Sequence, residues 1–287
     1  MQILKDRKPE WLKIKLATGT GYSEVGKIIK EHSLNTICSS GKCPNQNECW
    51  SRGTATFMIL GEICTRSCRF CATDTGRPIV IDIEEPFKLA QSVKLLGLKH
   101  CVITSVTRDD LPDQGAHHWA EVIKECRAQN PNVTIEVLIP DFSGDEALLD
   151  IVIDTKPDII AHNIETVKRV TPNVRSKADY NTSLKVLNYI SKSGIITKSG
   201  FMVGLGESEN EVFEALDHLY ENGCSVVTIG QYLRPTMNHI EVAEYITPNQ
   251  FEKYKERALS VGFTHAESGP LVRSSYMAER AITANKT

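Results

Sequence analysis

Three cysteines with the spacing CxxxCxxC constrain this chain more than any other feature. They are Cys64, Cys68 and Cys71, and they follow the apolar run of residues 56–60. Thiolates are the ligands of soft metals and iron–sulfur clusters, so three this close can hold three corners of a cubane cluster. No fourth cysteine lies within local reach. One iron is then open to a ligand from outside the protein, and an open coordination position indicates chemistry.

The alternative for this segment is a structural zinc site or a redox pair of cysteines. Zinc sites commonly combine two CxxC knuckles, or one knuckle with a histidine pair. The sequence has no second CxxC and no histidine close to the motif, so zinc is disfavoured.

A second cysteine trio precedes the first, with the spacing CxxxxCxxxxxC. Its members are Cys38, Cys43 and Cys49, and Gly41 and Pro44 predict that the segment is a loop. A zinc ion there needs a fourth ligand from elsewhere, and a disulfide leaves one thiol over. Beside CxxxCxxC, the trio favours a second cluster. The remaining cysteines are expected to be buried core thiols: Cys101, Cys126 and Cys224.

Composition excludes several classes of protein. The 287 residues, 41% of them hydrophobic, can build one sizeable core. The net charge of -3, without a basic stripe, disfavours nucleic-acid binding, and no apolar run reaches membrane-spanning length. The N-terminus does not resemble a secretory signal. Nine cysteines without such a signal indicate a reducing compartment, and we expect a cytoplasmic location.

From residue 56 onward, β-rich runs alternate with amphipathic helical stretches. The expected strands are 56–61, 101–105, 133–139, 159–162, 199–204 and 226–231. The expected helices are 86–96, 115–128, 145–154, 180–191, 208–221 and 248–261, with an earlier one at Ser23–His32. Six βα units predict a parallel sheet with right-handed crossovers. Periodicity alone leaves a doubly wound sheet and a barrel open, and six units are too few for a full eightfold barrel.

Ligands of parallel βα folds bind at the carboxyl ends of the strands, so the polar residues there are candidates. Asn163 and Glu165 suit hydroxyls or an amine, and Arg175 suits a carboxylate. Ser105 ends the second expected strand, and Gly204 and Gly206 allow a ligand to approach the backbone closely. Polar strand ends also occur simply because strands leave the core. Four histidines lack metal-binding spacing, and His162 alone stays open as a candidate: His117, His118, His162 and His239.

The first motif, with the aromatic Phe70 before its last cysteine, resembles the signature of the radical S-adenosylmethionine enzymes. The combination of CxxxxCxxxxxC, CxxxCxxC and the C-terminal segment Arg273-Ser274-Ser275-Tyr276 resembles the lipoyl synthase family. The likeness extends over nearly the whole chain. Small departures are Gln114, where the family tends to have glycine, and Ala161, where a polar residue is common.

This resemblance implies a partial (βα)6 TIM-type barrel at residues 55–262. An N-terminal extension, 1–54, and a C-terminal extension, 263–287, then carry an auxiliary cluster within one integrated domain. The implied cofactors are two [4Fe–4S] clusters and S-adenosyl-L-methionine. The resemblance assigns the catalytic cluster to Cys64, Cys68 and Cys71. It assigns the auxiliary cluster to Cys38, Cys43, Cys49 and Ser275, with Ser274 as the fallback ligand. Phe70, Ser105, Asn163, Glu165 and Arg175 are the candidate cofactor-binding residues.

The implied reaction inserts two sulfur atoms into a protein-bound octanoyl-lysine chain. A radical derived from S-adenosylmethionine removes hydrogen from unactivated carbons, and the auxiliary cluster is consumed as the sulfur source. Such C–H cleavage is beyond side-chain acids and bases, so a cofactor must carry it. Ser275 supplies a hard oxygen ligand, which is expected to be the weak corner of the auxiliary cluster.

Expected partners are octanoylated lipoyl carrier domains, either of 2-oxoacid dehydrogenase E2 subunits or of the glycine cleavage H protein. A ferredoxin- or flavodoxin-type reductant and an iron–sulfur cluster carrier that rebuilds the auxiliary cluster are also expected. No nucleic acid or membrane partner is expected. The segment Trp11–Lys15 is a candidate cover for the acyl site.

Two other functions compete with this one. A biotin synthase or methylthiotransferase type of enzyme shares CxxxCxxC but lacks the upstream trio combined with the C-terminal motif. A two-cluster electron-transfer or cluster-carrier protein ligates both clusters fully with cysteine and needs no barrel of polar strand ends. Binding of S-adenosylmethionine separates the carrier from either enzyme.

Overall fold

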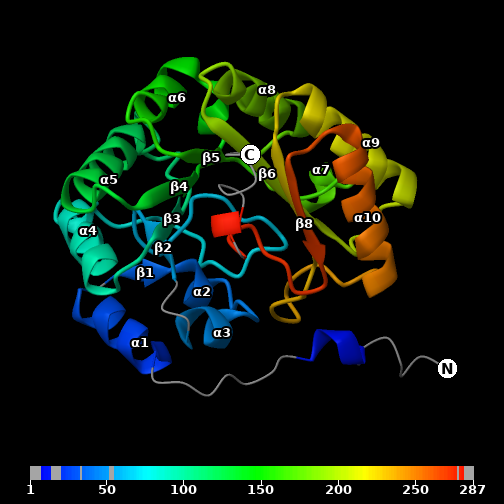
Figure 1. Ribbon diagram of the computed structural model, residues 1–287, viewed down its shortest axis with the longest axis horizontal. Helices are drawn as coiled ribbons and strands as arrows, with labels where there is room; N and C mark the ends of the chain where they lie inside the picture. The colour runs from blue at the N-terminus through cyan, green and yellow to red at the C-terminus, as the bar shows by residue number, and fades with distance from the viewer. Residues whose placement is uncertain (1–7, 14–20, 33, 52–54, 277, 281–287) are drawn as a thin grey trace.

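The sheet at the centre of the molecule has eight strands that lie side by side in chain order (Figure 1). The computed structural model describes residues 8–13, 21–32, 34–51, 55–276 and 278–280. The short first strand runs antiparallel to the second, and all later neighbours are parallel. The strands are β1 (Asn35–Thr36), β2 (Thr56–Ile59), β3 (His100–Ser105), β4 (Thr134–Leu138), β5 (Ile159–Ala161), β6 (Ile196–Val203), β7 (Val226–Gln231) and β8 (His265–Gly269).

The helices that alternate with the parallel strands form the outer layer of the curved sheet (Figure 1). They are α4 (Glu85–Leu95), α5 (Ala116–Gln129), α6 (Glu146–Ile153), α8 (Tyr180–Ser191), α9 (Glu209–Glu221) and α10 (Pro248–Val261). The short helix α7 (Thr171–Val174) belongs to the connection between β5 and α8 and lies inside this layer. Before the first parallel strand come η1 (Glu10–Leu12), α1 (Gly21–Glu31), α2 (Ile37–Ser40) and α3 (Gln46–Ser51), and a second 3₁₀ turn, η2 (Phe142–Gly144), follows β4.

The sequence explains the boundaries of these helices. Ser208 and Glu211 form a reciprocal capping box at the start of α9. Asp145, Asp179 and Thr247 cap α6, α8 and α10 by accepting a backbone N–H with the side chain. All residues of β2 and of β7 are buried, as expected for parallel strands covered on both faces.

The predicted fold class is confirmed. All six expected βα units are present, and their strands form a partial TIM-type barrel. The sheet does not close, because β1 and β8 end it without pairing to each other. Strand β8 was not predicted; it lies in the expected C-terminal extension and pairs in parallel with β7. Its polar sequence, His-Ala-Glu-Ser-Gly, hid it from a search for apolar runs.

Two local predictions were wrong. The first helix begins at Gly21 rather than at Ser23. Residues 38–49 are not a plain loop, because α2 and α3 flank a short turn. Thr36 caps α2 by accepting the N–H of Ser39 at 3.3 Å, and Lys42 turns the chain with a φ of 48°. Of the predicted cover at Trp11–Lys15, only residues 11–13 are described, and Leu12 is buried.

The open side of the barrel is filled by α2, α3 and the C-terminal segment after β8 (Figure 1). The side chain of Asn45 donates to the carbonyl of Leu271 at 2.7 Å, which ties the first cysteine segment to the C-terminal one. Gly230 lets the C-terminal segment lie directly on β7: a Cβ atom there would stand 2.1 Å from the carbonyl oxygen of Val272.

Replacing Gly230 by alanine is therefore expected to push the C-terminal segment off β7. Overpacking of this kind costs about 1–3 kcal/mol. Thermal unfolding measures the loss, and hydrogen exchange should rise in residues 272–276. Gly26→Ala is the matched control, since a Cβ in that helix meets only the Trp50 ring at 3.5 Å. The control should be neutral or slightly stabilising. Unchanged exchange at 272–276 in Gly230→Ala would contradict the close-approach argument.

Candidate active site

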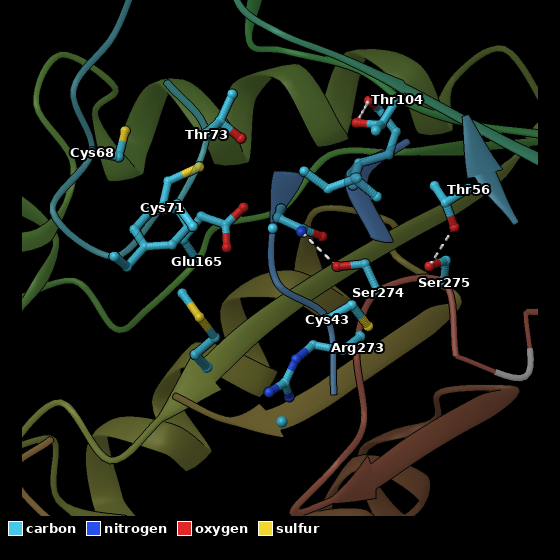
Figure 2. A pocket seen from close by; sticks show the side chains of 18 of the residues that line it. Cys43, Thr56, Cys68, Cys71, Thr73, Thr104, Glu165, Arg273, Ser274 and Ser275 are labelled. Carbon is cyan, nitrogen blue, oxygen red and sulfur yellow. Dashed lines mark hydrogen bonds between the residues drawn. The ribbon is translucent and has the colours of Figure 1, made fainter. Parts of the chain in front are cut away.

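One large cavity, of about 520 Å³, lies at the carboxyl ends of the strands. Members of both cysteine trios line it, from opposite sides of the barrel opening. Figure 2 shows Cys68, Cys71 and Glu165 on one side, and Cys43 with Ser274 and Ser275 on the other. The predicted cluster ligands other than Cys49, and all five candidate cofactor-binding residues, line it: Cys38, Cys43, Cys64, Cys68, Phe70, Cys71, Ser105, Asn163, Glu165, Arg175 and Ser275.

The segment Cys64–Cys71 is fixed to the sheet through β3. The backbone N–H of Thr65 donates to the carbonyl of Thr107 at 3.0 Å, and the Thr65 hydroxyl donates to the same carbonyl at 2.9 Å. The Cys64 sulfur accepts backbone N–H groups from Arg66 at 3.4 Å and from Thr107 at 3.3 Å. Donors aimed at sulfur stabilise a thiolate, which is the form that ligates metal.

Two further segments hold the other end of this motif. The N–H of Arg69 donates to the carbonyl of Val174 after α7, and Ile240 donates to the carbonyl of Arg69. The ring of His239 lies 2.9 Å from the carbonyl of Cys71. The motif is thus held from three sides by groups far away in the sequence, which fixes where its sulfur atoms point.

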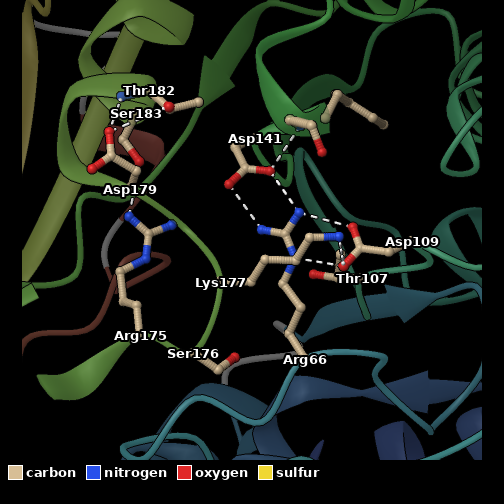
Figure 3. Close-up of polar contacts among 12 residues, drawn as sticks. Arg66, Thr107, Asp109, Asp141, Arg175, Ser176, Lys177, Asp179, Thr182 and Ser183 are labelled. Atoms are coloured by element: carbon tan, nitrogen blue, oxygen red, sulfur yellow. Dashed lines mark hydrogen bonds and ion pairs between the residues drawn. The ribbon is translucent and has the colours of Figure 1, made fainter. Parts of the chain in front are cut away.

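Arg66, inside the cysteine motif, is the centre of a buried ion network (Figure 3). Its guanidinium makes paired hydrogen bonds to Asp109, at 2.9 and 2.8 Å, and to Asp141, at 2.8 and 2.8 Å. Lys177 contacts Asp109 at 3.2 Å. Only a planar, forked cation can satisfy two carboxylates in this manner. The network joins the cysteine motif to the ends of β3 and β4.

The two carboxylates stay ionised well into the acid range. Although burial opposes ionisation, the hydrogen bonds from Arg66 lower the pKa of Asp109 and of Asp141. A group with a lowered pKa contributes stability above its unfolded pKa, about 3.9 for aspartate, and loses it as the pH falls through the folded value. The network is therefore intact at neutral and mildly acidic pH.

Glu165 occupies a strained position beside the first cysteine trio. Its φ of 67° is uncommon for a residue other than glycine. The backbone is held there by a bond from Met202 N–H to the Glu165 carbonyl at 2.9 Å. Burial raises the pKa of Glu165, while Arg175 and Asn163 partly oppose that shift. Strain maintained by the surrounding structure is a feature of functional sites.

Arg175 is buried and lines the same cavity as Glu165. Its guanidinium donates to the hydroxyl of Ser183 at 2.8 Å and lies 3.4 Å from the carbonyl of Ile164. Within the described part of the chain, no carboxylate forms an ion pair with it. A buried guanidinium that has no described carboxylate at ion-pair distance is suited to the carboxylate of a ligand. The Ser105 hydroxyl also has no hydrogen-bond partner among the described residues, although the atom is buried.

A smaller cavity, of about 50 Å³, adjoins the C-terminal segment. All three cysteines of the upstream trio line it together with Ser275, whereas Ser274 lines only the larger cavity. The hydroxyl of Thr56 donates to Ser275 at 2.8 Å, and the side chain of Asn163 donates to Ser274 at 2.8 Å. The two serines therefore face different surroundings, and Ser275 shares its space with the thiols.

The thiols of this trio are largely withdrawn from water. Burial raises the pKa of Cys38 and of Cys43, and the charge of Arg273 partly offsets the shift at Cys43. Burial raises the pKa of Cys71 in the other trio in the same way. Ligation to metal must then release protons from these thiols.

A buried cluster of charged side chains inside the barrel was not predicted from the sequence. Lys198 donates to Glu136 at 2.6 Å, and His100 lies 3.1 Å from the other oxygen of that carboxylate. Glu136 lines the large cavity and His100 lines the small one. Arg66, Asp109 and Asp141 were also missed as candidates. Asp141 could have been predicted, because it is a polar residue shortly after the carboxyl end of β4, where ligands of parallel βα folds bind.

Two predicted candidates, the strand end at Gly204–Glu207 and His162, make their contacts with other residues of the chain. Gly204 packs against Gln231 and Glu244, and Glu207 accepts the N–H of Leu205, so this strand end does not line the cavity. His162 donates from Nδ1 to the carbonyl of Ile139 at 3.0 Å, and its Nε2 lies 3.0 Å from the hydroxyl of Ser183. Burial lowers the pKa of His162 to about 4, so its ring is neutral at pH 7.

The other predicted histidines and cysteines behave as expected. His117 contacts Asp113, and His118 contacts Glu85. The three cysteines outside the two trios are buried: Cys101, Cys126 and Cys224.

Comparison with known proteins gives the class. The sequence pattern of the "Radical SAM superfamily" matches residues 58–219, which include the first cysteine trio. Solved structures with the same fold include methylornithine synthase, with a TM-score of 0.56 at 11% identity, covering 88% of this chain and 83% of that one. A maturase of the [FeFe]-hydrogenase gives 0.57 at 13% identity, covering 79% and 61%. The chain is a radical S-adenosylmethionine enzyme.

Curated relatives narrow the class further. Lipoyl synthase of Bacteroides fragilis (strain YCH46) is 58% identical over 279 residues, 97% of each chain. That of Treponema denticola is 58% identical over 276 residues, 96% of this chain and 95% of the relative. The mitochondrial lipoyl synthase of Nematostella vectensis is 54% identical over 279 residues, 97% and 96%. The chain belongs to the lipoyl synthase family, as its three sequence motifs predicted.

Replacing Arg66 by glutamine should destabilise the protein strongly. The change leaves two buried carboxylates without their cation, which costs about 3–5 kcal/mol. Anaerobic denaturant unfolding between pH 5 and pH 8 measures the loss. The loss should be larger at pH 8 than at pH 5, because burial raises the pKa of Asp109 and Asp141 once Arg66 is gone, and protonation at the lower pH relieves part of the unpaired charge.

The control is Arg169→Gln. Arg169 also pairs with a carboxylate, that of Glu211, at 2.6 Å, but its side chain is 61% exposed. That variant should lose less than about 1 kcal/mol. Equal losses in the two variants would contradict the importance assigned to the buried network.

Proposed function

We propose that Cys64, Cys68 and Cys71 hold the [4Fe–4S] cluster of this radical S-adenosylmethionine enzyme. The hydrogen bonds to the Cys64 sulfur and the three-sided attachment of the motif support the assignment. Bound there with S-adenosylmethionine, the cluster supplies the radical that removes hydrogen from an unactivated carbon. The residues of this chain hold the thiolates in place, surround the reacting carbon and separate it from bulk water.

We propose that S-adenosylmethionine binds against the wall formed by Phe70, Ser105, Asn163, Glu165 and Arg175. Arg175 is buried without a carboxylate at ion-pair distance among the described residues, and it can receive the carboxylate of the cofactor. The unpartnered hydroxyl of Ser105 and the carboxylate of Glu165 provide polar contacts on the same wall. The wall lies beside the catalytic cysteines, where such a cofactor must reach the open iron.

A second, auxiliary cluster is proposed at Cys38, Cys43, Cys49 and Ser275. The cavity that these four residues share is the observation that carries the proposal. Among the described residues, no group of three His, Cys, Asp or Glu side chains is close enough together to hold a single metal ion. A cubane binds each ligand at a different iron atom and so needs ligands spread around a space. The donor set of three thiols and one hydroxyl fits such a group.

The substrate is proposed to be the octanoyl-lysine chain of a lipoyl carrier domain. Both cysteine trios face one cavity, so a carbon held there has the radical source on one side and the sulfur source on the other. Lys8, near the expected N-terminal cover, also lines this cavity. The carrier is an E2 subunit or the glycine cleavage H protein, the reductant is of ferredoxin or flavodoxin type, and a cluster carrier rebuilds the auxiliary site.

We keep the division of the chain into an N-terminal extension (1–54), a barrel (55–262) and a C-terminal extension (263–287) as a proposal. The contact of Asn45 with Leu271 and the position of β8 in the sheet support one integrated domain. None of the described helices is both long and apolar enough to cross a membrane. A cytoplasmic location remains the proposal.

Loss of the auxiliary cluster should separate the two halves of the reaction. Cys43→Ala should still form 5′-deoxyadenosine from S-adenosylmethionine, dithionite and an octanoyl-lysine peptide, but no lipoyl peptide. Mass spectrometry under anaerobic conditions measures both products. Cys224→Ala, which alters a buried core thiol, should keep both products. Lipoyl peptide from Cys43→Ala would sink the auxiliary assignment, and absence of 5′-deoxyadenosine from the parent protein would sink the proposed function.

The two serines of the C-terminal motif should differ. Ser275→Ala should lower the auxiliary iron content or the yield of lipoyl peptide at least tenfold, because Ser275 shares the cavity of the trio. Ser274→Ala should keep the auxiliary iron, because Ser274 bonds to Asn163 instead. Iron analysis and Mössbauer spectroscopy of reconstituted protein compare the two. The reverse pattern would transfer the ligand role to Ser274.

A further inference from the structure

The end of α7 and the segment that follows it lie against the first cysteine motif. The carbonyl of Val174 accepts the N–H of Arg69, and Lys177 contacts Asp109 of the Arg66 network. Between them, Ser176 stands beside Ser67 and Cys68. In Figure 3, Ser176 lies next to Arg66 and Lys177. Val174 and Ser176 therefore attach this part of the chain to the motif, and Lys177 attaches it to the Arg66 network.

The contacts of Ser176 fix the direction of its hydroxyl group. The backbone N–H of Ser67 donates to the Ser176 oxygen at 3.1 Å. The sulfur of Cys68 lies 3.8 Å from the same oxygen, across 108 positions of sequence. A thiolate bound to iron can only accept, so the hydroxyl proton must be the donor of this contact. Ser176 has no other partner among the residues that the structure describes, which leaves that proton free for the sulfur.

We propose that Ser176 is a positioning residue that donates a hydrogen bond to the cluster-bound sulfur of Cys68 and thereby raises the reduction potential of the catalytic cluster. Hydrogen bonds to cysteine sulfur are one of the factors that set the potential of an iron–sulfur cluster. They stabilise the reduced state more than the oxidised one, because the reduced cluster carries more negative charge. This inference rests on the assignment of Cys64, Cys68 and Cys71 under Proposed function.

The sulfurs of Cys64 and Cys68 then have different sources of hydrogen bonds. The Cys64 sulfur accepts from two backbone N–H groups, which no substitution removes without disturbing the chain. The Cys68 sulfur depends on one side chain from a distant segment. Since Ser176 is adjacent to Arg175, the same short segment carries a residue of the proposed cofactor wall and a donor to the cluster. Replacing the Ser176 side chain can therefore change the potential through the sulfur of Cys68.

The test measures the potential of the catalytic cluster alone. Full-length protein carrying Cys38→Ala, Cys43→Ala and Cys49→Ala is reconstituted anaerobically with iron and sulfide, and its potential is measured by titration monitored by electron paramagnetic resonance. Adding Ser176→Ala should shift the midpoint to a more negative value. Ser176→Thr, which keeps the hydroxyl, should have a midpoint close to that of the protein with Ser176. Ser260→Ala is the matched control, because this exposed serine bonds only to the carbonyl of Arg257 in α10.

The role of Ser176 and the assignment of the catalytic cysteines are tested by different outcomes. An unchanged midpoint in Ser176→Ala overturns the proposal, and so does lower iron content with an unchanged midpoint, because the side chain would then only hold the backbone. An equal shift in Ser260→Ala also overturns it. A background protein that binds no [4Fe–4S] cluster refutes the cysteine assignment, and the inference with it.

Discussion

The buried contact of Arg66 with Asp109 and Asp141 is the interaction on which the arrangement of the site depends. The arginine belongs to the cysteine motif, while the aspartates follow β3 and β4. Removing two carboxylates and a guanidinium from water is costly unless every hydrogen bond is made, and the paired geometry makes them. The motif can then keep its shape through contacts of the protein alone, before any metal contributes.

From this anchor, the rest of the site follows by geometry. The parallel strands bring their carboxyl ends to one opening, and the cysteine motif closes one side of it. The opposite side is closed by segments from both ends of the chain, which the Asn45–Leu271 hydrogen bond joins, while Gly230 lets the C-terminal segment lie on β7. A single cavity therefore has one trio of thiols on each side. That arrangement suits a reaction in which hydrogen removal and sulfur insertion occur at the same carbon.

The sequence predicted much of this arrangement because the relevant signals are local. Cysteine spacing identifies a ligand set without any tertiary information, and alternation of apolar runs with helical stretches identifies six βα units. The strand-end rule identified Asn163, Glu165 and Arg175, all of which line the cavity. It misplaced the Gly204–Glu207 turn, because a polar strand end can equally well bond to its own backbone. The search for apolar runs overlooked β8, because Ala266 is the one apolar and buried residue of that strand and its other residues are half-buried.

What the sequence by itself determined is the chemistry: which thiols occur in which spacing, and which family combines them with Arg273–Tyr276. What only the tertiary structure decided is the environment of each group. Each of the deciding contacts joins residues far apart in the chain. Ser275 bonds to Thr56 and Ser274 to Asn163, so these two neighbours differ in their surroundings. Lys198 is buried with Glu136, and Ser176 lies against Cys68. The physical reason is that hydrogen bonds, desolvation and close packing depend on distance in space, and spacing along the chain does not encode such distances beyond a few residues.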